Sequence, residues 1–150
     1  MKIIPKFEVK LVRNRSSKYD IDSKRITSTQ DATEFGKRVC ARMLLDSPNE
    51  RVLCVALSTK NEVIGITEIT AGTLDASLVH PREFFRPAIL QNASSVIIVH
   101  NHPSGDLTPS TADFSMMNRL ETAGENLGIT LLDSLIVADE NAISMKQEGC

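Results

Sequence analysis

Two histidines and an acid stand close together in the segment "HNHPSGDLTPSTAD", residues 100–113. His100 and His102 follow the apolar run "SSVIIV", which is typical of a buried strand. Residues two apart on an extended chain point to the same side, so both imidazoles can reach one ion. Asp113 falls in the first turn of the next predicted helix and can supply a third ligand. Zinc in a catalytic site usually takes three protein ligands of these kinds and keeps one position for water.

Ser110 and Asp113 also fit a role without chemistry. Ser-x-x-Asp before an apolar run is a capping box, in which the serine and the acid satisfy backbone amides at a helix start. What favours a metal site is the coincidence of HxH, a Pro-Gly turn and an acid eleven residues after the second histidine. Open α/β sheets place their sites at such strand ends. The residues alone leave both interpretations open.

The hydrophobic pattern predicts the elements that position these residues. Strands are expected over residues 7–13, 51–58, 63–70, 94–100, 129–139 and 142–145. A polar turn joins 51–58 to 63–70 as a hairpin, and 71–75 is a loop. In the second half, strands alternate with helices. This alternation predicts an α/β fold in which a mixed sheet is flanked by helices.

Three helices accompany these strands. The first is expected to begin near Ser28 or Thr29 and to end before Ser47. The second covers 81–92 and has to accommodate Pro87. The third covers 110–126. The apolar faces are expected to consist of Ala32, Phe35, Val39 and Met43 in the first helix and of Met116, Leu120, Ala123 and Leu127 in the third.

Composition limits the class of protein. The 150 residues fit a single domain, and 41% hydrophobic and 24% charged residues are normal for a soluble globular chain. No apolar run approaches the ~20 residues of a membrane span, and the N-terminus lacks a secretion signal. The three cysteines form no CxxC pair, which indicates free thiols in a reducing cytosol, two of them in the core. A cytoplasmic protein is therefore expected.

The charge is uneven along the chain. The net charge is −2, but the first 25 residues are strongly basic. Their cations are Lys2, Lys6, Lys10, Arg13, Arg15, Lys18, Lys24 and Arg25, against the acids Glu8, Asp20 and Asp22. We expect residues 1–27 to form a basic N-terminal strand and loop, and residues 28–150 to form the domain. The basic segment is either a solvated edge or a contact for nucleic-acid phosphates.

The motif resembles a known family. "HNHPSGDLTPSTAD" fits the JAMM pattern H-x-H-P-x6-S-x2-D of the JAB/MPN metallo-hydrolase superfamily, and "HNHPSG" is similar to its RadC-like branch. "GTLDASLVHPREFFRPAI" and "LGITLLDSLIV" resemble that branch as well, so the resemblance spans roughly residues 30 to 146. It implies the MPN/JAB, cytidine-deaminase-like architecture. One departure is Ser134, where the branch often has histidine.

The resemblance implies specific roles. His100, His102 and Asp113 would bind zinc, and Ser110 would stabilise the oxyanion of a tetrahedral intermediate. A glutamate before an early strand would act as general base, which matches Glu50, with Glu68 as the competitor. No metal role carries over to His80. The implied reaction is zinc-dependent hydrolysis of a peptide or isopeptide bond, with a protein or peptide as substrate. The oligomeric state stays open.

Two other functions remain open. One is a DNA-associated accessory protein, linked to DNA repair or to mobile elements, that uses the basic N-terminal segment and keeps a structural or vestigial metal site. The second is a metal-dependent phosphoesterase or nuclease, although such enzymes usually employ two metals and the ligands here suffice for one. A zinc nucleoside deaminase is excluded because it would need P-C-x-x-C.

Overall fold

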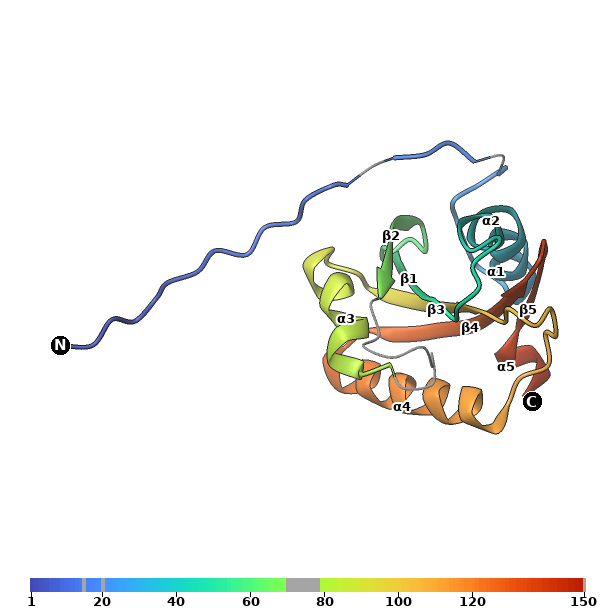
Figure 1. Cartoon of the computed structure of the whole chain (residues 1–150). Coiled ribbons are helices and arrows are strands. Elements are labelled where there is room, and N and C mark those ends of the chain that lie inside the picture. Colours follow the sequence, from blue (N-terminus) through green and yellow to red (C-terminus); the bar gives the residue numbers. More distant parts are fainter. Residues whose placement is uncertain (15, 20, 70–78, 150) are drawn as a thin grey trace.

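A single sheet with helices on both faces forms the body of the protein (Figure 1). The computed structural model describes residues 1–14, 16–19, 21–69 and 79–149. The elements are α1 Thr29–Phe35, the π-helical segment η1 Gly36–Cys40, α2 Ala41–Met43, β1 Val52–Leu57, β2 Val63–Ile69, α3 Pro81–Leu90, β3 Ser95–Asn101, α4 Thr111–Leu127, β4 Thr130–Ala138, β5 Asn141–Ser144 and α5 Met145–Glu148.

The five strands are ordered β2-β1-β3-β4-β5. β1 pairs with β2 and with β3 in the antiparallel sense, β3 and β4 are parallel, and β4 and β5 form an antiparallel hairpin. The parallel pair needs a long crossover, and α4 supplies it. The mixed α/β sheet and the hairpin over 51–70 are confirmed for the described residues. The expected loop over 71–75 lies outside them.

Alternation along β3 divides the core into two halves. Val96 and Ile98 pack with α3 and α4 on one face, whereas Ile97 and Val99 pack with α1 and its neighbours on the other. Figure 1 shows α4 along one face and α1 and α2 on the opposite one. Because β3 is buried on both faces, its sequence is continuously apolar. His100 continues the row of side chains that faces α4.

The first helix departs from the expected continuous α-helix. It is interrupted by η1, and Ala32, Phe35 and Val39 are buried as expected. After the π turn, Leu44 enters the core while Met43 is only half-buried. A π turn has i→i+5 hydrogen bonds, so it shifts the buried face by about one residue. Single-sequence periodicity assumes a uniform helix and therefore missed this shift.

The prediction of a strand over residues 7–13 is wrong. These residues have no helix or strand, and the described part of 1–18 is exposed throughout. Figure 1 shows this segment extending away from the body of the protein. An alternating sequence becomes a strand only when a neighbouring strand satisfies its backbone groups. Within the part of the chain that the structure describes, the first β-bridge occurs later, where Arg25 pairs with Glu62 at the β1–β2 turn.

Two helices behave largely as expected. α3 accommodates Pro87 inside its length, and His80 caps its start by accepting a hydrogen bond from the Arg82 N–H. In α4, Met116 and Leu120 are buried, but Leu127 is 51% exposed, contrary to the expected apolar face. Leu127 is the last residue of α4, directly before the left-handed Gly128 that ends the helix. Among the described residues, no helix is long and apolar enough to cross a membrane.

Candidate metal centre

The two histidines are positioned by β3 and its pairing with β4. His100 is fully buried at the end of β3, on the face covered by α4. His102 lies just beyond the strand, yet its N–H donates to the Val137 carbonyl at 3.0 Å, so the extended pairing continues. The two rings therefore project on the same side, as a spacing of two predicts.

Asp113 comes from the first turn of α4, whose start is fixed by a cap. The Ser110 hydroxyl accepts from the Asp113 N–H at 3.1 Å, and the Asp113 carboxylate accepts from the Ser110 N–H at 2.9 Å. The capping box expected from the sequence is therefore present. Gly105, at a φ of 88°, makes the turn that brings the chain back from β3. This turn sets the helix start beside the strand end.

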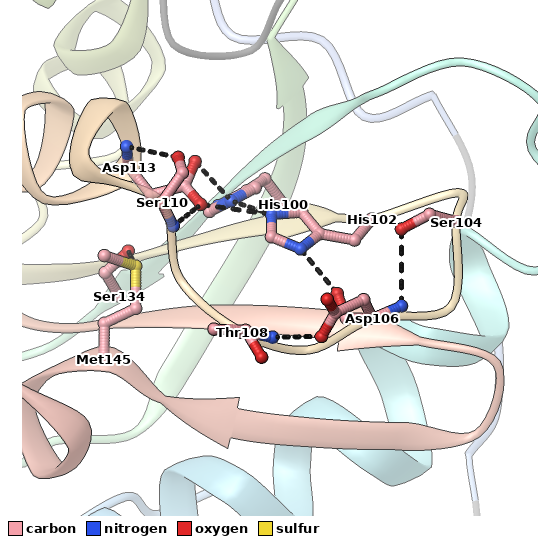
Figure 2. A network of polar contacts seen from close by, with 9 residues as sticks. All are labelled: His100, His102, Ser104, Asp106, Thr108, Ser110, Asp113, Ser134 and Met145. Carbon is pink, nitrogen blue, oxygen red and sulfur yellow. Dashed lines mark hydrogen bonds and ion pairs between the residues drawn. The ribbon is translucent and has the colours of Figure 1, made fainter.

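The three side chains converge on one point (Figure 2). The Nε2 atoms of His100 and His102 are 3.2 Å apart, and they lie 3.3 and 3.2 Å from the two Asp113 oxygens. Zinc bonds of about 2.0–2.1 Å at tetrahedral angles separate neighbouring ligand atoms by about 3.3–3.4 Å. The observed spacing fits such an ion, and two imidazoles with one carboxylate form a donor set that zinc accepts.

Contacts behind the histidines set their orientation. His102 Nδ1 lies 2.7 Å from the Asp106 carbonyl oxygen, and because a carbonyl oxygen only accepts, Nδ1 is the donor; in the neutral ring the lone pair is then on Nε2. Figure 2 shows this contact on the side of the ring that faces away from Asp113. His100 Nδ1 is buried and has no hydrogen-bond partner among the described residues. Nε2 of His100 is thus the nitrogen that faces other polar groups.

The electrostatics favour an ionised Asp113. Burial raises the pKa of its carboxyl group, but contacts with His100 and hydrogen bonds from Ser110 lower it more. The net result is a pKa of Asp113 well below its usual range. The carboxylate therefore has the charge that metal ligation requires near neutral pH.

Glu50 lies in the same pocket as this cluster. In the antiparallel pairing of β1 with β3, Val52 lies opposite His100. Continued two residues past this pair, the same register brings Glu50 toward His102. Glu50 is two residues from Val52, so on an extended chain both side chains point to the same face of the sheet. Val52 belongs to the core half on the α4 face. The pocket is lined by Glu50, His102, Pro103, Ser104, Ser110, Ala112 and Asp113.

Glu68 has a different environment. It lies on β2 opposite Leu53. Its carboxylate accepts hydrogen bonds from the Arg51 guanidinium, one of them 2.6 Å from Nε. The structure therefore brings Glu50, but not this alternative, into the pocket lining described above.

Sequence reasoning missed Asn101 and Asp106. Asn101 is buried and hydrogen-bonds to the segment on either side of Glu50. A buried amide at a strand end signals an interaction with backbone groups, but its partners are some 50 positions away in the chain. Asp106 contacts His102 through its backbone carbonyl, so the type of side chain at this position gives no sign of the contact.

The remaining singled-out residues lie in structural contacts. The Ser134 hydroxyl donates to the Met145 sulfur at 3.2 Å on the α4 face of the sheet (Figure 2). Cys40 and Cys54 are free and buried, as expected for core thiols. Burial raises the pKa of each of these thiols to about 12, so neither is a reactive thiolate. Cys150 lies outside the described residues.

Comparison with known proteins identifies relatives. The model of the RadC-like JAB domain family matches residues 26–150. A UPF0758 protein of Desulfitobacterium hafniense is 50% identical over 105 residues, 70% of this chain and 45% of that protein. A UPF0758 protein of Thermotoga maritima is 46% identical over 126 residues, 83% of this chain and 56% of its own length. The chain thus spans about half the length of these relatives, whose names give no reaction.

Proposed function

This chain belongs to the RadC-like JAB domain family, and from that premise we propose that it is a zinc-dependent hydrolase of JAMM type that cleaves amide bonds. The observation that carries the proposal is the convergence of two imidazoles and one carboxylate: the two Nε2 atoms are 3.2 Å apart, and they lie 3.3 and 3.2 Å from the two different oxygens of Asp113. That spacing fits zinc. The buried position of His100 and Asp113 supports a preformed site.

In this proposal His100, His102 and Asp113 hold the ion. Zinc, when bound, supplies a positive charge that acidifies water and polarises a carbonyl group. The Asp106 carbonyl keeps His102 in the tautomer whose Nε2 can bind, which holds the ligand geometry before the ion arrives. The helix cap at Ser110 fixes where the Asp113 carboxylate lies.

Glu50 is the general base. It takes a proton from water as the water oxygen bonds to the carbonyl carbon, and it passes that proton to the amide nitrogen as the C–N bond breaks. The carboxylate is regenerated when the amine leaves. The pocket that Glu50 shares with His102 and Asp113 supports this role.

Ser110 stabilises the oxyanion by donating its hydroxyl hydrogen. In the cap the Ser110 oxygen accepts from the Asp113 N–H, and a hydroxyl can accept and donate at the same time. The cap therefore orients the hydroxyl without consuming its hydrogen. The position at the N-terminus of α4 adds a favourable field for negative charge. We propose a protein or peptide substrate with a peptide or isopeptide bond.

The first test is metal content by inductively coupled plasma mass spectrometry. Protein purified without a metal-binding tag is expected to hold about one zinc per chain, because the site offers three convergent ligands. His102→Ala and Asp113→Ala are expected to lose it. His80→Ala is the matched control, because it removes a histidine that caps α3 and stands apart from the cluster of His100, His102 and Asp113, and it is expected to keep zinc. Wild-type protein that takes up no zinc even after reconstitution would contradict the proposal.

A nucleic-acid-associated role is the second candidate. It is favoured by the exposed segment 1–14, which carries Lys2, Lys6, Lys10 and Arg13 against the single acid Glu8. Such a segment can neutralise phosphates while the domain remains folded. In this alternative the metal site has a structural or vestigial role.

A further inference from the structure

Asn101 stands between the two histidines and reaches the segment that carries Glu50. Its side chain is buried, with a residue exposure of 4%. The side-chain oxygen accepts from the Arg51 N–H at 2.6 Å, and the side-chain nitrogen donates to the Asn49 carbonyl at 3.1 Å. The Asn101 backbone N–H also points to the Arg51 carbonyl, at 3.4 Å.

These contacts enclose Glu50 from both sides. The Asn49 carbonyl belongs to the peptide group before Glu50, and the Arg51 N–H belongs to the peptide group after it. Holding both peptide groups limits rotation about the two backbone dihedrals of Glu50, which are the soft degrees of freedom of that residue. The direction of the Glu50 side chain then depends on Asn101.

The chemistry of the position requires an amide. One end of the side chain must accept from an N–H and the other must donate to a carbonyl, which asparagine does on a short, stiff stem. Aspartate of the same shape would keep the acceptor but would face the Asn49 carbonyl with a second oxygen. Alanine would leave the Arg51 N–H and the Asn49 carbonyl without this partner, at a cost in free energy.

The strand that holds Asn101 also positions two of the candidate ligands. His100 and His102 flank it in the chain, and its backbone N–H continues the pairing of β3 with β1 by pointing to the Arg51 carbonyl. Any displacement of the two histidines is therefore shared by the group that holds Glu50. The distance between the base and the histidines is set through one strand, which suits a site that must be accurate to a fraction of an ångström.

We propose that Asn101 is a positioning residue that holds the Glu50 carboxylate beside His102 and Asp113. This inference rests on the proposed role of Glu50 as general base. Asn101 touches neither the substrate nor the ion. It acts through the two peptide groups that flank Glu50.

The test compares Asn101→Asp and Asn101→Ala with Asn118→Asp, which makes the same chemical change at an exposed position of α4. Amide hydrogen exchange is measured by NMR on the zinc-loaded protein. Asn101→Ala is expected to speed exchange of the Arg51 amide about tenfold, because it loses the hydrogen bond that protects it. Asn101→Asp keeps that acceptor, so the Arg51 amide stays protected. Core amides such as that of Val55 are expected to be unchanged in all variants.

A second readout reports where Glu50 lies. Cobalt(II) is loaded in place of zinc, and the paramagnetic shifts of the Glu50 side-chain protons are compared among the variants. Both Asn101 variants are expected to change these shifts, because Asp also loses the contact to Asn49. The ring protons of His100 are expected to keep theirs, and Asn118→Asp to match the wild type throughout.

Each outcome decides the inference. The role of Asn101 would be refuted if the metal-loaded Asn101→Ala and Asn101→Asp variants gave the same paramagnetic shifts of Glu50 as Asn118→Asp. That result would leave the proposed function standing. Faster exchange of the Val55 amide together with that of Arg51 would reduce Asn101 to a general support of the fold and overturn the inference as well. Failure of the wild type to take up either metal would instead overturn the proposed function, and with it this inference.

Discussion

Glu50 and Glu68 show how environment separates two identical groups. Glu50 shares a pocket with His102 and Asp113, whereas Glu68 is held by the Arg51 guanidinium on β2. A general base has to lie within reach of the proton it takes, so position decides the role before acidity does. In the same way Asp113 is both a cap and a candidate ligand, because one oxygen faces His100 while the other accepts from the Ser110 N–H and also faces His102.

At the residue scale, we expect Glu50→Gln to abolish hydrolysis without releasing zinc. Glutamine keeps the shape but cannot take a proton, so the rate of cleavage should fall roughly 100- to 10,000-fold. The measurement is cleavage of peptide and isopeptide probes by zinc-loaded protein, with metal content determined in parallel. Glu68→Gln is the control and is expected to cleave at the wild-type rate. A larger loss in Glu68→Gln than in Glu50→Gln would exchange the two assignments.

At the scale of elements, one strand, one turn and one helix start build most of the site. β3 ends in the histidine pair, and α4 begins with the cap that fixes Asp113. The loop between them is shaped by Gly105 and by the contact of His102 with the Asp106 carbonyl. Because these parts are consecutive in the chain, the geometry of the candidate ligands is set locally.

The cap and the proposed chemistry of Ser110 can be separated with a second capped helix. Ser28 caps α1 as Ser110 caps α4, through a hydrogen bond from the backbone of the third residue on. Ser110→Ala and Ser28→Ala are each expected to lower the free energy of unfolding by about 1 kcal/mol. Only Ser110→Ala should also slow hydrolysis, roughly 100- to 1,000-fold, because it removes an oxyanion donor.

Chemical denaturation and the same cleavage assay provide both measurements for these serine variants. Equal rates of hydrolysis in Ser110→Ala and Ser28→Ala would show that Ser110 is a cap and nothing more.

At the scale of the whole molecule, the sheet and its two core halves are independent of the exposed N-terminal segment. Residues 1–14 make no helix or strand, and their side chains are exposed. Tyr19 and Ile21 are partly buried against the core half on the α1 face, and the first buried residue among those that the structure describes is Ile26. The family match begins at the same residue.

Deleting residues 1–14 is therefore expected to leave the free energy of unfolding within about 0.5 kcal/mol of the wild type. Zinc content should not change either. If the segment binds nucleic acid, the deletion should weaken binding and reduce the salt slope by up to about 0.9 for each lost cation. Thermal or chemical unfolding and binding titrations at several salt concentrations measure these effects. A clear loss of stability would show that the segment packs on the domain.

The sequence by itself determined the parts that depend on neighbouring residues. The HxH pair at a buried strand end, the turn at Gly105 and the cap of α4 follow from spacing and residue type. The order of strands and helices follows from periodicity in the same way. Alternation over residues 7–13 was a misleading signal, because a strand also needs a partner that the local sequence does not specify.

Only the tertiary structure decided what lies opposite the histidines. The antiparallel register of β1 and β3 brings Glu50 toward His102, whereas Glu68, on the neighbouring strand β2, meets the Arg51 guanidinium. Asn101 reaches the backbone of Arg51 across 50 positions of sequence. Such contacts depend on how two strands align, and alignment is set by the packing of whole faces rather than by any short stretch of residues.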